Sequence, residues 1–522
     1  MPRLNDATPQ ISVRLYKTIS RKTVDGKSAV SARYAGKDAY IDLTPYLGAG
    51  ASVITSKSLR DPAGSFSITF ADKPNTAGVS VGAPLPSAAL ETVYGLVEPM
   101  DVVEIRMWGG LGPKPSVMPI KMRGFVSQIN RTQAMNSDGK PSRSVIVSGQ
   151  DYGKLWQVYQ ILYLQAYAAG NALLTTYNLW ELFGINAQNT MSASDFVKAA
   201  VEKILNPYIA GFMPEKSPIP KELKSLKLDA SVSHGVINNS YQGQEGSIYE
   251  LLKTFGDVGI WNELYTEDRE DGVYVVYRPS PALHITKPDG AKTHKIQDDA
   301  PDPIYVDVSD DHIQSIVSSR SDANLANFFW VSNQRYDMIS DIFRKLLAIN
   351  DSDTTVNLKD YPNAATKYYG VRPMYGETQQ SNDDVKILTS GLDANGQTVR
   401  TEQLEAWIDN RRRLMVEMNK DAVVLETGSA RIKGGLMRPP SKDGKREHFK
   451  PGDYARFTQG SLVFEGYVTQ ITDEFIPLQS YTASIQYERG TGFVTRAQMK
   501  AGYNSPWLAE QSTRSNTAQG KH

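Results

Sequence analysis

The sequence predicts a β-rich α+β protein of several domains, and three observations support this class. The chain has 522 residues, too many for one hydrophobic core, so we expect roughly three or four domains. Apolar residues make up 40% and charged residues 22%, the balance of a folded chain. With 40 glycines, 28 prolines and 27 tyrosines, the composition favours strands and turns over helical bundles.

Composition also excludes several classes of function. The chain has no cysteine, which rules out disulfides, thiol nucleophiles and Cys-ligated zinc. Residues 1–20 lack an apolar segment, so we expect no Sec signal peptide. No run of about 18 apolar residues occurs, so we expect no membrane insertion.

Charge is balanced overall but unevenly distributed. Residues 1–60 carry ten basic and four acidic side chains, whereas Glu245–Asp311 carries six basic and fifteen acidic ones. This asymmetry fits a nucleic-acid site or ion pairing between neighbouring subunits, and the zero net charge argues against a dedicated DNA binder.

The segment up to Asp151 is expected to be all-β. Apolar and polar residues alternate with period two in Ser65–Phe70 and again around Ile105 and Val147. Turn sequences at Asp61–Gly64 and Asn136–Gly139 separate these strands.

Helical periodicity follows from Tyr152 to about Phe212. Ser192–Asp195 has the spacing of a capping box, and Asn206-Pro207 is expected to end the helix that it starts. The apolar face of that helix comprises Phe196, Val197, Ala200, Val201, Ile204 and Leu205. Pro214–Lys227 is predicted to be a connector.

A mixed segment comes next. Ser247–Glu250 resembles a second capping box, and Gly256 should end its helix. We then expect a hairpin whose turn is Asp268–Gly272, followed by more strands over Ile304–Val331.

The remaining sequence is predicted from weaker patterns. Asp337–Arg400 is polar, with loop sequences at Asn350–Asp353 and Asp393–Gly396. A helix is expected over Thr401–Lys420, with its apolar side at Leu404, Trp407, Ile408, Met415 and Met418. Strands should continue to about Arg496, and Asn504–His522 should form a loose tail.

One β module occurs twice in the chain. Gly124–Ile129 reads GFVSQI and Gly466–Ile471 reads GYVTQI, and each is preceded by a Pro-x-Asp turn at Pro99–Asp101 or Pro451–Asp453. An alternating strand closes each copy, at Arg143–Ser148 and Ser480–Tyr487. Pro-x-Asp turns alone are common before strands, but the matched string in matched order indicates a duplicated unit.

With these motifs the sequence resembles the baseplate hub proteins of contractile-tailed phages, the group of the T-even hub and the late-control D proteins. The resemblance rests on Pro99–Asp151 in the first module, on the helix and hairpin of Gly246–Pro279, and on Pro451–Gly490 in the second module.

That resemblance implies two tail-tube-like β-barrel domains, a helical insertion and a small mixed α+β domain. The expected divisions are 1–151 (first barrel), 152–227 (helical insertion and connector), 228–335 (mixed domain, which may contribute strands to the second barrel), 336–430 (variable polar segment and helix), 431–497 (second barrel) and 498–522 (tail). It also implies a homotrimer in the virion tail baseplate, assembled in the host cytoplasm, with the central spike, tail tube, wedge and tape-measure proteins as partners and DNA passing through without specific binding.

No set of residues has the spacing of a catalytic, cofactor or metal site. Glu98, Asp101 and Glu104 could serve a glycan hydrolase, but turn capping or solvent exposure is the commoner role of such carboxylates. Asp298, Asp299, Asp302, Asp310, Asp311 and His312 could bind a divalent cation, although such runs are usually solvated loops. Gly48–Gly50 and Gly109–Gly112 lack the features of a phosphate loop. Arg411–Arg413 is expected on a solvated or interfacial helix face.

We therefore expect no enzyme activity, no metal and no cofactor. The favoured function is that of a trimeric hub lining a DNA conduit. Part of the acidic segment Glu245–Asp311 is expected to face the lumen, and the alternative is that the segment forms acidic outer loops. The alternatives are a distal tail or tube-initiator protein, or a cell-wall hydrolase or glycan-binding tail module.

Overall fold

The fold was analysed in a computed structural model of the chain, which confirms a β-rich α+β protein. The residues that it describes are 8–18, 40–48, 50–72, 92–110, 115, 117–135, 139, 141–161, 190–213, 219–238, 246–283, 295–333, 366–381, 394–419, 422–423, 425–440, 446–459 and 462–491. No helix within this described part is both long and apolar enough to cross a membrane. The expected loop at Asn350–Asp353 and the C-terminal tail lie outside it.

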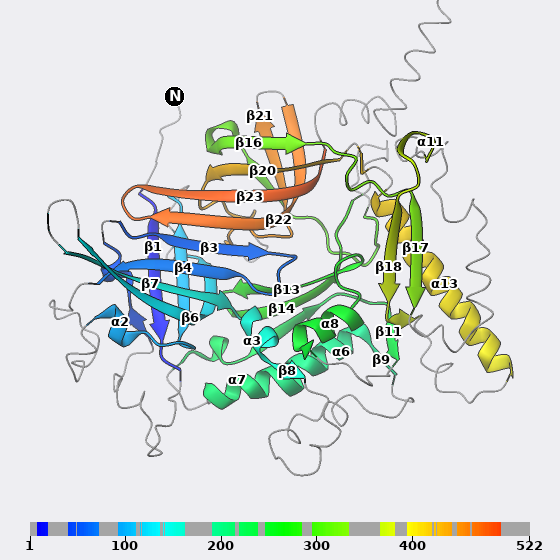
Figure 1. The fold of residues 1–522 in the computed structure, drawn as a ribbon, viewed down its shortest axis with the longest axis horizontal. Helices are drawn as coiled ribbons and strands as arrows, with labels where there is room; N and C mark the ends of the chain where they lie inside the picture. The colour runs from blue at the N-terminus through cyan, green and yellow to red at the C-terminus, as the bar shows by residue number, and fades with distance from the viewer. Residues whose placement is uncertain are drawn as a thin grey trace, which may run out of the picture.

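A single 13-stranded sheet dominates the molecule (Figure 1). Its strands follow the order β16-β20-β23-β22-β3-β4-β7-β6-β5-β1-β2, with β21 pairing β22 and β15 pairing β21. Their bounds are β1 Gln10–Tyr16, β2 Ile41–Asp42, β3 Val53–Ser58, β4 Ser65–Ala71, β5 Val102–Trp108, β6 Ile120–Met135, β7 Pro141–Asp151, β15 Tyr305–Val308, β16 Ile313–Ser319, β20 Glu426–Lys433, β21 Tyr454–Gln459, β22 Leu462–Ile476 and β23 Ser480–Thr491. The short helices η1 (Thr44–Tyr46) and α2 (Val93–Leu96) accompany the first strands.

Both copies of the repeated module lie in this sheet. In each copy the strands follow one another in the same order along the chain and have equivalent neighbours in the sheet. In the first module β5, β6, β7, β4 and β3 lie side by side, and in the second β21, β22, β23, β20 and β16 do. Every neighbouring pair in both modules is antiparallel. The sequence repeat is therefore a repeat of structure.

The two Pro-x-Asp turns are alike in detail. Met100 and Gly452, which follow the prolines, have φ values of 72° and 93°. The Asp101 carboxylate accepts the Glu98 amide at 2.8 Å, and that of Asp453 accepts the Lys450 amide at 3.0 Å. Each long strand then has a bulge at the same place in its pairing with the next strand, between Val126 and Gln128 or between Val468 and Gln470. The turns cap their strands as the sequence predicted.

Helices and a hairpin form a second body against the first module. α6 (Ala193–Ala200), η3 (Val201–Leu205) and α7 (Asn206–Phe212) run continuously, and α3 (Gly153–Val158) and α8 (Ile248–Phe255) pack nearby. Both predicted capping boxes are confirmed, since Ser192 accepts the Asp195 amide at 3.1 Å and Ser247 the Glu250 amide at 3.2 Å. Gly256 also ends α8 as expected.

The predicted stop at Asn206-Pro207 is wrong. Pro207 lies inside the continuous helix, as the second residue of α7. The preceding η3 is a wide π turn, which accommodates the ring. The Asn206 side chain also bonds the backbone of Leu226 on both sides, at 2.7 Å and 3.1 Å.

The hairpin consists of β13 (Asn262–Arg269) and β14 (Gly272–Pro279). Its strands run further into the turn than expected, leaving only two residues between them. β10 (Leu226–Ala230) extends it as a parallel strand and spans the predicted division at residue 227, where a connector was expected. Short pairs are made by β8 (Gln160–Ile161) with β12 (Gly246–Ser247), and by β11 (Val236–Asn238) with β9 (Thr190–Ser192).

The polar segment and its helix pack at the far side of the hairpin. β17 (Phe328–Asn333) pairs in parallel with β18 (Pro373–Thr378), next to α11 (Thr366–Tyr369) and β19 (Gln380–Ser381). The short helix η5 (Asp310–His312) lies between β15 and β16 in the chain and contacts β21. α13 (Ala394–Asn419) begins within Asp393–Gly396, so the loop predicted there is wrong. Its residues Trp407, Ile408, Met415 and Met418 are buried as expected. Leu404 was also predicted on the apolar side of this helix, but its side chain is outside the described part of the structure.

We predict that Gly149→Ala destabilises the first module. A methyl group on Gly149 would overlap the carbonyl oxygen of Phe125 and the ring of Phe66. Overpacking of this kind costs about 1–3 kcal/mol, so the midpoint of thermal unfolding, followed by circular dichroism, should fall. The control is Gly211→Ala in α7, where the methyl group meets open space and should be neutral or slightly stabilising. Equal midpoints for the two variants would contradict the packing described.

Candidate assembly interface

The two modules are joined by backbone pairing between β22 and β3. Residues 470–475 of β22 lie antiparallel to residues 53–58 of β3, with Thr472 opposite Ser56. The Leu59 amide extends the pairing by donating to the Thr469 carbonyl at 2.9 Å. Because β22 also pairs with β21 through its first half, one long strand belongs to the second module and closes against the first.

Side chains reinforce this junction on both faces of the sheet. On one face the hydroxyls of Ser56 and Thr472 lie 2.9 Å apart, and Gln470 donates to Ser56 at 3.1 Å. On the other face Lys121 of β6 pairs with Asp473 at 2.5 Å. Phe475 and Tyr481 enter the apolar core of the first module. The second module therefore supplies part of the core of the first.

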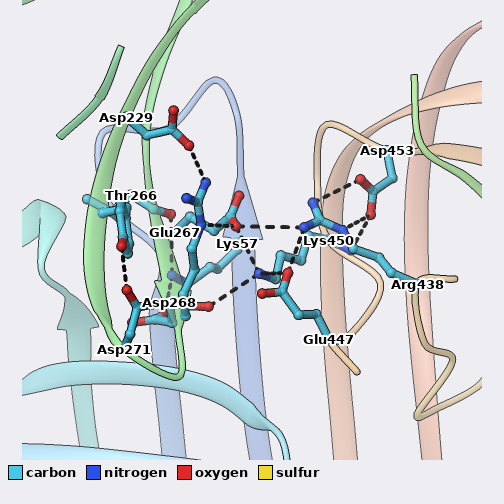
Figure 2. A network of polar contacts seen from close by, with 12 residues as sticks. Lys57, Asp229, Thr266, Glu267, Asp268, Asp271, Arg438, Glu447, Lys450 and Asp453 are labelled. Carbon is cyan, nitrogen blue, oxygen red and sulfur yellow. Dashed lines mark hydrogen bonds and ion pairs between the residues drawn. The ribbon is translucent and has the colours of Figure 1, made fainter. Parts of the chain in front are cut away.

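The hairpin packs against the core side of the junction and contacts both modules through buried charges (Figure 2). From the first module, Lys57 pairs with Asp268 of β13, and with Asp151 at 3.3 Å. From the second, Lys450 pairs with Glu267 of β13 at 2.9 Å. A single strand thus bridges the two modules.

The second-module side of this network extends to its Pro-x-Asp turn. Arg438 donates to both carboxylate oxygens of Asp453, at 2.8 Å and 2.9 Å, and to Glu447 at 2.9 Å. Lys450 also donates to Glu447 at 2.8 Å. The turn that begins β21 is therefore fixed to the hairpin through shared ion pairs.

Two buried members of the network, Glu267 and Lys57, have partners that favour their charged forms. Burial disfavours the charged form of Glu267, but Lys450, Arg438 and Arg269 outweigh it and hold the pKa of that carboxyl well below its usual range. Burial also works against the Lys57 ammonium, yet Asp268 and Asp151 raise its pKa above the ordinary value. The network is a set of mutually dependent charges, each of which would be costly without its partners.

Two strand segments at opposite ends of the joined sheet have one edge without a strand partner among the described residues. One is the outer half of β6, residues 128–135, which pairs only with β7, because β5 pairs with the inner half. The other is β16, which pairs only with β20. Both segments are mostly exposed, with Met135 73% and Val317 64% accessible. In Figure 1 the β6–β7 hairpin and β16 lie at opposite sides of the sheet.

One face of the sheet is polar and uncharged over β3, β4, β7 and the outer half of β6. Farther along the same face, on β5 and the inner half of β6, Arg106 and Arg123 contact the hairpin. On the first group of strands the outward side chains bear hydroxyl, amide or aliphatic groups: Ile54, Ser56, Ser58, Ser65, Ser67, Thr69, Gln128, Asn130, Thr132, Ser144, Ile146, Ser148 and Gln150. The second module adds charges to this face, among them the pair of Arg431 with Glu474 at 3.3 Å. Its middle is a wall of neutral hydrogen-bonding groups.

The structure gives internal partners to the three carboxylates that sequence analysis considered for catalysis. Asp101 and Glu98 both contact Lys17, at 2.5 Å and 3.3 Å. Glu104 is buried between Arg106 and Arg123, at 2.6 Å and 2.9 Å, rather than exposed. Burial raises the pKa of Asp101 to about 6, although Lys17 lowers it. All three carboxylates are used in internal ion pairs.

The other candidate residues are dispersed. Asp299 accepts from Ser233, and Asp302 pairs with Lys295, and within the described residues no group of His and carboxylate side chains could hold a metal ion. Arg411 is buried against the rings of Trp407 and Trp261, at 4.1 Å and 5.5 Å, so the expectation of an exposed or interfacial row is wrong for this residue. Its neighbour Arg412 pairs with Asp409 at 2.9 Å.

Sequence reasoning missed the basic residues of the network. Lys57, Lys450 and Arg438 are separated by long stretches of sequence, and each looks like an ordinary surface residue. One signal was available: Glu267 and Asp268 continue the β13 strand, where alternation places one of two adjacent residues on each face. Two adjacent acidic residues in a hairpin strand indicate that at least one is paired internally.

The protein was compared with known families and structures. No protein-family model matches the sequence, and neither does any curated protein. Among solved structures, a tail protein from Neisseria meningitidis MC58 aligns with a TM-score of 0.42 and 11% identity over 92% of this chain and 97% of its own. The 43 kDa tail protein of prophage MuSo2 from Shewanella oneidensis gives 0.39 and 11% over 92% and 96%.

A third structure is the E. coli c3393 protein, described as a component of the type VI secretion system with structural similarity to the T4 bacteriophage tail proteins gp27 and gp5. It aligns with a TM-score of 0.35 and 6% identity, over 84% of this chain and 72% of its own.

We predict that Lys57→Met strongly destabilises the protein, because it leaves Asp268 buried without its cation. Breaking a buried pair in this way costs about 3–5 kcal/mol, which urea unfolding followed by tryptophan fluorescence would measure. The matched control is Lys227→Met, whose pair with Asp271 is half exposed and should be worth less than about 1 kcal/mol.

A double variant, Lys57→Met with Asp268→Asn, should recover part of the loss by removing the orphaned charge. If Lys57→Met and Lys227→Met unfolded at the same urea concentration, the buried network would not hold the hairpin to the sheet.

Proposed function

We propose that the chain is a non-catalytic structural subunit of a phage-type tail, a baseplate hub protein that assembles as a trimeric ring. The observation that carries the proposal is the duplicated module joined into one sheet through β22 and β3. One chain then supplies two similar positions, and three chains supply six. A ring of this kind matches a sixfold tail tube on one side and a threefold spike on the other.

The two exposed strand edges support an assembled state. An unpaired strand edge is a site for pairing with another chain, and monomeric proteins usually protect such edges with lysine, proline or a covering element. Residues 128–135 of β6 contain no lysine or proline and one charged side chain, Arg131, and β16 contains no charged residue or proline. A subunit that functions inside a ring has no need of that protection.

The neutral face of the sheet suits a conduit. On β3, β4 and β7 the opposite face carries the apolar core, so in a closed ring the uncovered neutral part of the sheet would form the wall of the bore. Hydroxyl and amide groups offer phosphates no strong ion pairs, so DNA would pass without being retained. Part of the acidic segment, Glu267 and Asp268 among it, is internal, so lumen acidity remains a prediction for the rest of Glu245–Asp311.

The proposed partners follow from this position in the tail. They are the central spike, the tail tube, the baseplate wedges and the tape-measure protein, in a virion assembled in the host cytoplasm. A distal tail or tube-initiator protein is the main alternative, and a hexamer would favour it. A cell-wall hydrolase or glycan-binding module is the other, although the carboxylates that it would use are held in internal ion pairs.

Native mass spectrometry of the purified full chain tests the proposal. We expect a species of three 57.7 kDa chains at micromolar concentration, alone or on addition of a candidate spike protein. A stable hexamer would support the tube-initiator alternative, and a monomer under all conditions would contradict the ring. Zymography on peptidoglycan should show no clearing, and clearing that is lost in Glu104→Gln would support the hydrolase.

A further inference from the structure

We propose that each copy pairs with the next through its sheet: the outer half of β6 of one copy lies antiparallel to β16 of its neighbour, in a defined register. The inference rests on the proposed ring, and it names the surface and the partner, a second copy of this chain. The chain already contains a pairing of the same kind, between β22 and β3.

Equivalence of the modules assigns the two strands. β22 corresponds to β6, because each is the long strand that carries the Gly-aromatic-Val-polar-Gln-Ile string and the bulge in front of the next strand. β3 corresponds to β16, because each is the terminal strand next to β4 or β20. Within one chain, β22 of the second module pairs with β3 of the first module. The reverse junction would join β6 to β16, which lie at opposite ends of one chain's sheet, so another copy must supply one of them.

The register follows from the pairing of the intervening strands. In β22 and β6, Gln470 corresponds to Gln128 and Thr472 to Asn130, because the strings align without a gap. Val147 and Ile485 are equivalent, because Val147 pairs with Ile129 and Ile485 pairs with the matching residue Ile471. In the first module Val147 pairs with Ile68 of β4, which pairs with Val53 of β3. In the second module Ile485 pairs with Ala430 of β20, which pairs with Ile316 of β16. Val53 therefore corresponds to Ile316.

The same steps place Ser56 at Ser319. The pair of Thr472 with Ser56 inside the chain thus becomes Asn130 of one copy with Ser319 of the next. The neighbouring outward pair of Glu474 with Ile54 becomes Thr132 with Val317.

The exposure of these residues is consistent with that register. Val317, 64% accessible here, would be covered by its new neighbour, as the equivalent Ile54 is partly covered at 37%. Asn130 and Ser319 are both exposed and neutral, so this pair buries no charge. Because side chains alternate, a slip by one residue would place apolar side chains on the wrong face of the sheet.

Engineered disulfides in the full chain test the register, and the absence of native cysteine makes the result unambiguous. The test variant is Asn130→Cys with Ser319→Cys, and the slipped control is Asn130→Cys with Ser318→Cys. The matched positive control is Ser56→Cys with Thr472→Cys, whose hydroxyls lie 2.9 Å apart and which should form a disulfide within one chain.

After mild oxidation, non-reducing gels of the test variant should show covalent species of two and three chains, with most of the chain cross-linked. The slipped control should stay at least several-fold less cross-linked, and the positive control should stay monomeric on the gel and lose two hydrogens by intact mass. Reducing agent should return every species to one chain.

Two failures are distinguishable. A trimer by native mass spectrometry without Asn130–Ser319 cross-links, while the positive control closes, would overturn the β6–β16 pairing and leave the ring in place. A chain that is monomeric by native mass would contradict the ring itself. Cross-linking of the slipped control above the test pair would overturn the register.

Discussion

The structure depends on the backbone pairing of β22 with β3. Those hydrogen bonds join segments that are separated by about four hundred residues of sequence and turn two copies of one module into a single sheet. Backbone pairing is directional, so it sets the angle and register between the modules as well as holding them together. The core of the first module is incomplete without Phe475 and Tyr481 from the second. The chain is one cooperative body at this junction, with the hairpin as a brace.

We infer that the buried charges beneath the junction mainly select one arrangement of the two modules and the hairpin. Buried ion pairs contribute little net stability relative to apolar packing, but leaving one partner behind is expensive. The positions of Lys57 on the first module, Lys450 on the second and Glu267 and Asp268 on the hairpin can all be satisfied in one arrangement of the three bodies. We infer that the network selects that arrangement against others in which the modules slip.

Local sequence was sufficient for much of the fold. The capping serines Ser192 and Ser247, the Pro-x-Asp turns and the repeated GFVSQI and GYVTQI strings each depend on a few neighbouring residues, and each was predictable. The helix through Pro207 was not, because a π turn and the bonds of Asn206 to Leu226 are tertiary effects. The sequence did not indicate that Arg411 is buried. Its partner Trp261 is distant in sequence, and its contact with Trp407 depends on how the helix packs. The β22–β3 junction has no local signature, since any two alternating strands could pair.

Hydrogen exchange followed by mass spectrometry can detect the β22–β3 junction and its repetition between copies, because paired backbone amides exchange slowly. Peptides of β22 and β3 should be protected in the monomer and in the assembly alike. Peptides covering residues 128–135 and β16 should exchange quickly in a dilute monomer and become protected together when the ring forms. Fast exchange of β3 in the assembled protein would contradict the joined sheet. Assembly that leaves β16 unprotected would contradict the idea that the internal junction is repeated between copies.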